Sequence, residues 1–425
     1  ATLLSKGLKV HSRDYINKKN VELLTTLSLQ KDSVFIQRGS KVHIEGLIFE
    51  LSGSVFQSNI IDLNFSCEDQ ELAEVMNHTP EHLTSIYKSF QANGEFSCKG
   101  NIKGLISKED NPLLNMSCHI DKGNFILKSR PFILKNINLD GEITNGEDRN
   151  FQKTKIEITQ FDTETENGFI KGDFTIQNLN QYYLTADLSS SWDLAEINHY
   201  FEDSPFFNLQ GGLLANTQYS GHISFDDRFQ NYFLNAQHNS TTTFKNASFR
   251  YKAFPLEFNV QSVDCKFQNN TINVTNSIFT IADSDLNFNG DITDLIAYIL
   301  NKKDKINITG DLSSTYIKFD ELLTLKDLSE SNSTGTMPNW INANLNTNIT
   351  NFSYNTFIAS DITLQLAYKN LALTGKNMLM NSLNGNIAGD FKFYESNNKL
   401  KLFSNIKLKE LNIRNTFLAF DNFKQ

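Results

Sequence analysis

Apolar and polar residues alternate along much of this chain. Ile61, Leu63, Phe65 and Cys67 are each separated by one polar residue, and the same period of two recurs toward the end of the sequence. Such a period places every apolar side chain on one face of a β-sheet and every polar one on the other. Clusters of Asn, Asp, Gly and Ser, such as residues 144–148, separate the runs and predict turns. The pattern therefore predicts a long succession of antiparallel strands.

Signals for helices are few and short. The clearest begins at Thr79-Pro80, where a capping residue precedes a proline suited to a first helical turn. Apolar residues then follow at i, i+3, i+4 and i+7, as on one side of a helix. A second short helix is predicted to begin near Asp193. Weaker signals cover residues 291–300 and 319–325.

The predicted fold is mostly β with a few short helices: an elongated, curved antiparallel sheet of repeated units that forms a trough with an apolar inner face. We divide the chain into four segments. Residues 1–60 are a β segment leading into the repeats, and residues 61–180 are a first β repeat with a helical insert. Residues 181–330 are further β repeats with short helices, and residues 331–425 are a C-terminal β repeat that is cut before the next one. Residues 329–336 are the best loop candidate and are expected to link two repeats. Both chain ends suggest an internal fragment of a larger protein.

The apolar face of such a sheet must be shielded from water, either by other parts of the protein or by a ligand. Phe is over-represented, at 34 residues against 13 Tyr and 2 Trp, and a side chain without a polar tip needs a dry core or an apolar binding surface. The predicted helices are too few to cover the whole face, so we expect an open groove for alkyl chains, with a closed sandwich core as the alternative. With strands ~4.8 Å apart, about twenty strands would give a trough on the order of 100 Å long. The groove candidates are Ile61, Leu63, Phe65, Phe96, Ile156, Ile158, Phe174, Ile176, Ile272, Val274, Leu286, Phe288, Ile306, Ile308, Leu364, Leu366, Phe391, Phe393, Leu400 and Leu402.

Composition and motifs exclude several functional classes. The net charge of −9 and the scattered Lys and Arg residues argue against a nucleic-acid partner, which would favour a basic stripe. The sequence contains no G-x-S-x-G, G-x-G-x-x-G, Walker A or H-E-x-x-H motif. We therefore expect no enzymatic activity, no catalytic residue and no cofactor.

Two patterns resemble metal sites but are incomplete. His78 and His82 have the i, i+4 spacing of zinc ligands, but Pro80 between them ends one helix and starts another, so the two need not share a face. Residues 285–290 resemble the start of an EF-hand loop, yet Ile296 occupies the twelfth position, where calcium requires a bidentate Glu. No metal site is predicted.

The four cysteines are Cys67, Cys98, Cys118 and Cys265. None belongs to a C-x-x-C pair, which argues against a zinc site. Their places in alternating stretches favour buried, small apolar side chains. A disulfide between Cys67 and Cys98 stays open as an alternative in an oxidising compartment.

Several motifs resemble the AsmA family, in particular AsmA-like proteins of Bacteroidetes-type bacteria. In the first repeat they are residues 72–75 (LAEV), 79–83 (TPEHL), 90–96 (FQANGEF) and 99–104 (KGNIKG). Residues 408–423 near the end of the chain are similar to the same family. The likeness covers most of the chain in its strand pattern and about a third in motifs.

This resemblance implies a large protein of the Gram-negative cell envelope, related to TamB-like and bridge-like lipid-transfer proteins. It would lie in the periplasm and be anchored in the inner membrane through a segment outside this chain. Family members are linked to outer-membrane homeostasis and to phospholipid movement between membranes, and they have no catalytic residues to transfer to this sequence.

Three functional hypotheses follow from the pattern and the resemblance together. The first is a scaffold that holds or transfers lipids between inner and outer membrane, with phospholipid or other acyl chains as ligands and outer-membrane components as further partners. The alternative is a structural or assembly scaffold for outer-membrane protein biogenesis that offers strand edges without conducting lipid. A carbohydrate-binding adhesin is disfavoured by the 2 Trp residues and the incomplete calcium loop.

Overall fold

Strands dominate the structure, a computed structural model. They account for 73% of it and helices for 10%, so the predicted mostly-β fold with a few short helices and an open, curved antiparallel sheet is confirmed. The structure describes residues 2–10, 13–78, 90–107, 111–127, 132–150, 152–198, 206–224, 229–252, 254–323, 338–396 and 399–419. The helix predicted after Pro80 and the loop predicted over residues 329–336 lie outside these ranges.

The chain divides into two compact units. Unit 1 contains residues 1–191 and 216–237, and unit 2 contains residues 192–215 and 238–425. The division crosses strand β13 (Phe206–His222), whose residues are shared between the units. It falls inside the segment 181–330, where the sequence pattern indicates no domain boundary.

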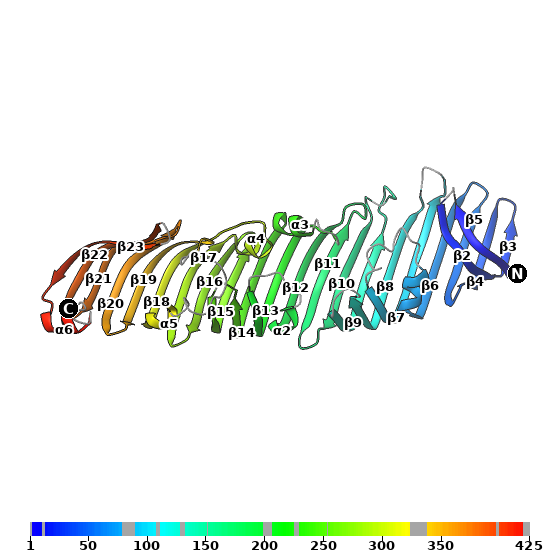
Figure 1. The fold of residues 1–425 in the computed structure, drawn as a ribbon. Coiled ribbons are helices and arrows are strands. Elements are labelled where there is room, and N and C mark those ends of the chain that lie inside the picture. Colours follow the sequence, from blue (N-terminus) through cyan, green and yellow to red (C-terminus); the bar gives the residue numbers. More distant parts are fainter. Residues whose placement is uncertain are drawn as a thin grey trace. The chain divides into compact units, whose positions relative to one another are not determined.

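Unit 1 is built on antiparallel strands that follow one another in chain order. Each strand from β4 to β12 pairs with the next, β2 and β3 share the other edge of β4, and β1 pairs with β2 (Figure 1). Helix α1 (Leu72–His78) packs against β6 and β7, and α3 (Phe229–Asn235) follows β13. The strands are β1 (Thr2–Val10), β2 (Arg13–Leu24), β3 (Leu27–Gln30), β4 (Ser33–Ile44), β5 (Leu47–Phe56), β6 (Ile60–Glu71), β7 (Phe90–Leu105), β8 (Leu113–Leu127), β9 (Phe132–Thr144), β10 (Lys155–Glu164), β11 (Phe169–Gln177) and β12 (Tyr183–Asp193).

Unit 2 continues the same construction with one exception. Its strands pair in chain order and antiparallel, except that β18 and β19 are parallel, with Ile306 opposite Ile341. The prediction of antiparallel strands does not hold at this pair, because β18 ends at Lys318 and β19 begins only at Ile341, and parallel neighbours need a crossover of about a dozen residues or more. The strands are β14 (Gln237–Tyr251), β15 (Phe254–Gln268), β16 (Thr271–Ile281), β17 (Ser284–Thr293), β18 (Ile306–Lys318), β19 (Ile341–Tyr354), β20 (Phe357–Lys369), β21 (Ala372–Ser382), β22 (Gly385–Ser396) and β23 (Lys399–Lys409).

The helices of unit 2 are short. They are α2 (Leu194–Ile197), α4 (Leu295–Ile299), α5 (Phe319–Leu323) and α6 (Ile413–Ala419). Helix α2 begins where the sequence predicts, because the Asp193 carboxylate accepts a hydrogen bond from the backbone N–H of Ala195 at 2.9 Å. Helix α4 is shorter than predicted, since β17 extends to Thr293. Helices α3 and α6 were not predicted, while α1 ends at His78, next to the Thr79-Pro80 pair at which the sequence predicts one helix to end.

Candidate functional site: rows of apolar side chains

In unit 1, strand pairing aligns apolar residues into straight rows across the sheet. Because residues directly opposite each other in a sheet project to the same side, each row lies on a single face. Row 1 crosses the eight strands from β5 to β12, seven spacings that amount to about 34 Å. Its members are Leu51, Phe65, Gly100, Met116, Ile143, Ile156, Ile176 and Leu184. Row 2, beside it on the same face, consists of Cys67, Cys98, Cys118, Gly141, Ile158, Phe174 and Ala186.

Unit 2 has rows of the same kind. Both continue through the parallel pair β18–β19, so the reversal of chain direction does not interrupt them. Row 3 crosses β15 to β23 through Phe267, Ile272, Ile292, Ile308, Ala343, Tyr368, Leu373, Phe393 and Leu402. Row 4 runs beside it through Cys265, Val274, Gly290, Gly310, Leu345, Leu366, Gly375, Phe391 and Ser404.

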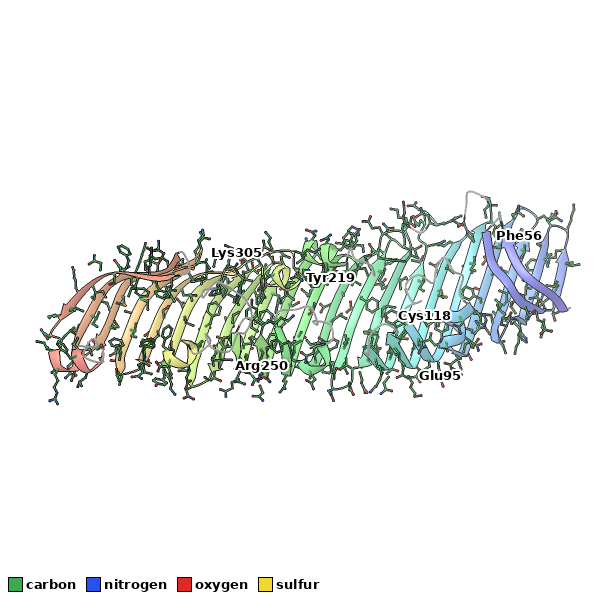
Figure 2. The ribbon with its side chains drawn as sticks, viewed as in Figure 1. Phe56, Glu95, Cys118, Tyr219, Arg250 and Lys305 are labelled. Atoms are coloured by element: carbon green, nitrogen blue, oxygen red, sulfur yellow. The ribbon has the colours of Figure 1, made fainter. Side chains whose placement is uncertain are left out.

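The opposite face of unit 1 is polar at the matching positions. One residue away from row 1 on each strand lies a polar row of Glu50, Ser66, Lys99, Ser117, Glu142, Glu157, Thr175 and Thr185. The two faces of the sheet therefore differ sharply in chemistry, as the alternation predicts. Figure 2 shows Cys118 within the span of its strand and Glu95 at a margin of the sheet.

The groove candidates differ in how far they remain accessible. Leu402 is 64% exposed, and the side chain of Leu400 lies outside the described part of the structure. The buried candidates are Ile61, Ile158, Ile272, Val274, Phe288 and Ile306. The half-buried candidates are Leu63, Phe65, Phe96, Ile156, Phe174, Ile176, Leu286, Ile308, Leu364, Leu366, Phe391 and Phe393.

Part of the apolar face of unit 2 is a closed core. Leu194 of α2 belongs to one cluster of buried residues with Val274 and Phe288, and Leu295 of α4 packs against that cluster. Leu322 of α5 packs against a second cluster, formed around Ile349 and Ile362. The predicted closed-core alternative therefore applies to this part of the sheet. At β23, rows 3 and 4 end in exposed residues, Leu402 and Ser404.

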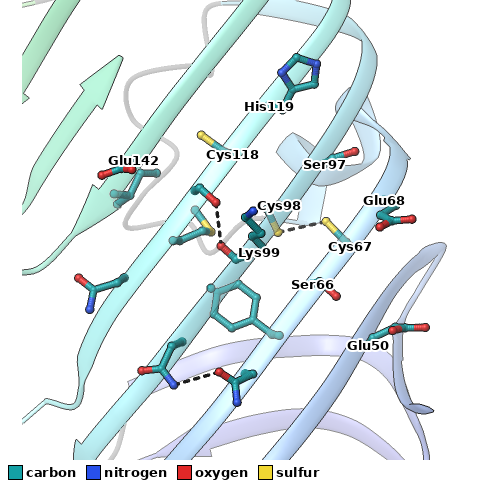
Figure 3. A pocket seen from close by; sticks show the side chains of 18 of the residues that line it. Glu50, Ser66, Cys67, Glu68, Ser97, Cys98, Lys99, Cys118, His119 and Glu142 are labelled. Atoms are coloured by element: carbon teal, nitrogen blue, oxygen red, sulfur yellow. Dashed lines mark hydrogen bonds between the residues drawn. The ribbon is translucent and has the colours of Figure 1, made fainter. Parts of the chain in front are cut away.

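Unit 1 contains a hollow with a volume of about 1140 Å³, lined by residues from β4 to β10 (Figure 3). Of the predicted groove residues, Phe65 is the one that lines it. The apolar part of the lining also includes Leu51, Met116, Ile143, Cys67, Cys98 and Cys118. The charged part includes Arg38, Glu50, Glu68, Lys99, Asp140, Glu142, Lys155 and Glu157. The hollow is thus bordered by both apolar and charged residues, and is not the purely apolar trough expected from the sequence.

The four thiols of the chain differ in their surroundings. The sulfur atoms of Cys67 and Cys98 are 3.1 Å apart. The hydrogen bond between them lowers the pKa of Cys67 and raises that of Cys98. Burial raises the pKa of Cys118 and raises that of Cys265 to about 12.

Among the described residues, no three His, Cys, Asp or Glu side chains lie close enough together to hold a metal ion. His78 contacts Glu74 through Nε2 at 3.0 Å, and His82 lies outside the described residues. Asp285 lies in a strand and accepts hydrogen bonds from the N–H groups of Thr315 and Tyr316. None of the described helices is long and apolar enough to cross a membrane.

The sequence analysis missed several members of the rows. Leu51, Met116, Ile143 and Leu184 all belong to row 1, but none was among the groove candidates. Each lies in a short alternating run, so the same period of two would have identified it. The alignment of three cysteines in row 2 has no such signal, because it depends on strand register.

Comparison with known proteins gives no match. No protein-family model, no curated protein and no solved structure corresponds to this chain. The resemblance to AsmA-like proteins therefore rests on the sequence motifs alone.

Proposed function

We propose that this chain is a scaffold that holds or transfers lipids between the inner and outer membranes of a Gram-negative bacterium and so supports outer-membrane homeostasis. The observation that carries the proposal is the set of rows of mainly apolar residues in each unit, many of whose side chains are only half-buried. Short helices cover part of these rows and leave the rest accessible to a ligand.

The dimensions and energetics of the rows suit acyl chains. Row 1 spans about 34 Å, whereas two opposed acyl chains together fill the ~30 Å hydrocarbon core of a bilayer. One acyl chain would therefore occupy about half of row 1. Each methylene removed from water contributes about 0.8 kcal/mol, and a row of Ile, Leu, Met and Phe side chains distinguishes little between lipids of different head group.

The cellular setting follows from the resemblance to AsmA-like proteins. The chain would lie in the periplasm and be held at the inner membrane by a segment outside it, with outer-membrane components as partners at the far end. Lipid would move by exchange along the apolar face, without a catalysed reaction and without a cofactor.

Paired substitutions on the two sheet faces test this proposal. Ile176→Asp and Leu366→Asp place a carboxylate on the apolar face, while Thr175→Asp and Gln365→Asp place the same group one residue away on the polar face. Transfer of a fluorescent phospholipid between vesicles, and lipid retained by the purified chain in mass spectrometry, should fall several-fold for the first pair only.

Thermal unfolding measured by circular dichroism separates a lost ligand surface from a lost fold. The milder Ile176→Ser and Leu366→Ser variants cover the case in which a carboxylate prevents folding. Equal transfer by apolar-face and polar-face variants that are all folded would show that the rows do not hold lipid.

A further inference from the structure

Three cysteines lie side by side on neighbouring strands of unit 1. Cys67 on β6 is directly opposite Cys98 on β7, and Cys98 is directly opposite Cys118 on β8 (Figure 3). Residues directly opposite in antiparallel strands have Cα atoms about 4.5–5.5 Å apart, within the ~4.4–6.8 Å range that disulfides span. Strand register thus brings these thiols into positions where a cross-strand bridge requires no rearrangement of the backbone.

The sulfur positions distinguish between the two pairs. The sulfur atoms of Cys67 and Cys98 are in contact at 3.1 Å. Burial and the carboxylate of Asp140 raise the pKa of Cys118. We propose that Cys67 and Cys98 form a reversible cross-strand disulfide, generated by exchange with a small disulfide oxidant of the glutathione type. This proposal does not depend on lipid binding.

Access to the pair is restricted to small molecules. Cys67 is 3% exposed and Cys98 is 7% exposed, so a folded oxidoreductase cannot reach either sulfur while the sheet is intact. All three cysteines nevertheless line the hollow of about 1140 Å³, which is large enough to admit a small oxidant. The hydrogen bond from Cys98 favours the thiolate of Cys67, the form that attacks a disulfide.

The disulfide forms in two successive thiol–disulfide exchange steps with oxidised glutathione. The Cys67 thiolate attacks one sulfur of oxidised glutathione, forms a mixed disulfide and releases one glutathione thiolate, which takes up a proton. Cys98 then loses its proton to solvent, attacks the Cys67 sulfur and releases the second glutathione thiolate. Two protein thiols are oxidised by two electrons, and one glutathione disulfide is reduced to two thiols.

A Cys67–Cys98 disulfide would link β6 to β7 and close the chain between them into a loop. Cys67 and Cys98 are 31 positions apart, and helix α1 lies between them in sequence. Closing a loop of this length restricts the unfolded chain, so oxidation should raise the unfolding temperature of unit 1. Because β6 and β7 are already paired, the folded structure should change little.

Cys265 provides a matched control. It lies on β15 of unit 2, opposite Thr242 and Val274, and so has no thiol directly across either strand pair. Burial raises its pKa to about 12, which keeps it protonated and unreactive near neutral pH. We expect Cys265 to stay reduced under conditions that oxidise the pair.

The experiment equilibrates the full chain with glutathione at a series of reduced-to-oxidised ratios, alkylates the remaining thiols and identifies linked peptides by mass spectrometry. The expected product is a single intramolecular Cys67–Cys98 link, with Cys118 and Cys265 alkylated. Oxidation should raise the unfolding temperature by several degrees in the wild type, in Cys118→Ala and in Cys265→Ala, but not in Cys67→Ala.

Three results would overturn the proposal. They are a predominant Cys98–Cys118 link, a link that forms only between chains, and full alkylation of Cys67 and Cys98 at the most oxidising ratio. Unfolding of the reduced Cys67→Ala and Cys67→Ser variants shows whether the substitution itself affects folding. If neither variant folds, the linked-peptide map of the wild type still decides the outcome.

Discussion

The ring of Phe65 on β6 lies over Gly100 on β7, with its Cζ atom 2.5 Å from the point that a Cβ on Gly100 would occupy. Both residues belong to row 1, where they are directly opposite each other. Row 1 therefore depends on a residue without a side chain at position 100, and the space is taken by the aromatic ring of the neighbouring strand.

Replacing this glycine should destabilise unit 1. In Gly100→Ala, the new methyl group would meet both the Phe65 ring and the backbone oxygen of Asn115, 2.6 Å away. Overpacking of this kind costs about 1–3 kcal/mol. Chemical denaturation should show that loss, while Gly46→Ala, whose Cβ would have no neighbour within 4 Å, should differ by less than about 0.5 kcal/mol. Equal stabilities of the two variants would contradict the contact.

Asp285 should make the stability of unit 2 sensitive to acid. Partial burial tends to raise its pKa, but hydrogen bonds from Thr315, Tyr316 and Ser314 outweigh burial and lower it. A lowered pKa stabilises the folded state fully above the unfolded value of about 3.9, and this contribution is lost as pH falls through the folded pKa. Asp285→Asn should therefore cost about 1–2 kcal/mol at pH 7 and progressively less below pH 4.

Urea unfolding at a series of pH values checks this prediction. The control is Asp311→Asn, because the Asp311 side chain accepts a hydrogen bond from the amide of Asn346 on an exposed part of the sheet. Its cost should be smaller at pH 7. A difference between wild type and Asp285→Asn that stays constant down to pH 2 would show that the charge of Asp285 does not matter.

The turn between β16 and β17 should accept a stabilising substitution. Ala282 has a φ of 50°, a left-handed conformation that is unfavourable for residues with a Cβ. It is exposed, so Ala282→Gly removes the conformational penalty and loses little contact. We expect a gain of about 0.5–1 kcal/mol in the free energy of unfolding. Ala367→Gly within β20 should have the opposite sign, and thermal unfolding of the two variants compares them directly.

Helix α2 should contribute strongly to the closed core of unit 2. Leu194 is 5% exposed and packs in a cluster with Val260 and Val263, so Leu194→Ala should cost about 2–5 kcal/mol. Asp193→Ala removes only the cap of the same helix and should cost about 1 kcal/mol. Guanidinium unfolding would measure both. A loss below 1 kcal/mol for Leu194→Ala would mean that α2 does not cover the apolar face.

The alternation of residues predicted the strands and their apolar face because each sheet has one apolar and one polar side. Ile61 to Cys67 lies in β6, and Leu286 and Phe288 lie in β17, with their apolar side chains on the predicted face. A period of two carries this information locally, so no knowledge of the pairing is needed.

The register between strands could not be predicted in the same way. Cys67 meets Cys98 through a register that runs without a shift from Ile60 opposite Leu105, and alternation within one strand does not specify that register. Alternation also gives no signal for the parallel pairing of β18 with β19. The coverage of Phe288 by α2 likewise arises from contacts between residues far apart in sequence.

Rows made of one residue per strand give this architecture an adjustable length. Inserting one hairpin adds two strands, lengthens every row by about 10 Å and leaves the chain running in its original direction. Inserting a single residue within a strand would instead turn its remaining apolar side chains to the polar face. Changes in the span of such a protein during evolution should therefore occur in whole hairpins.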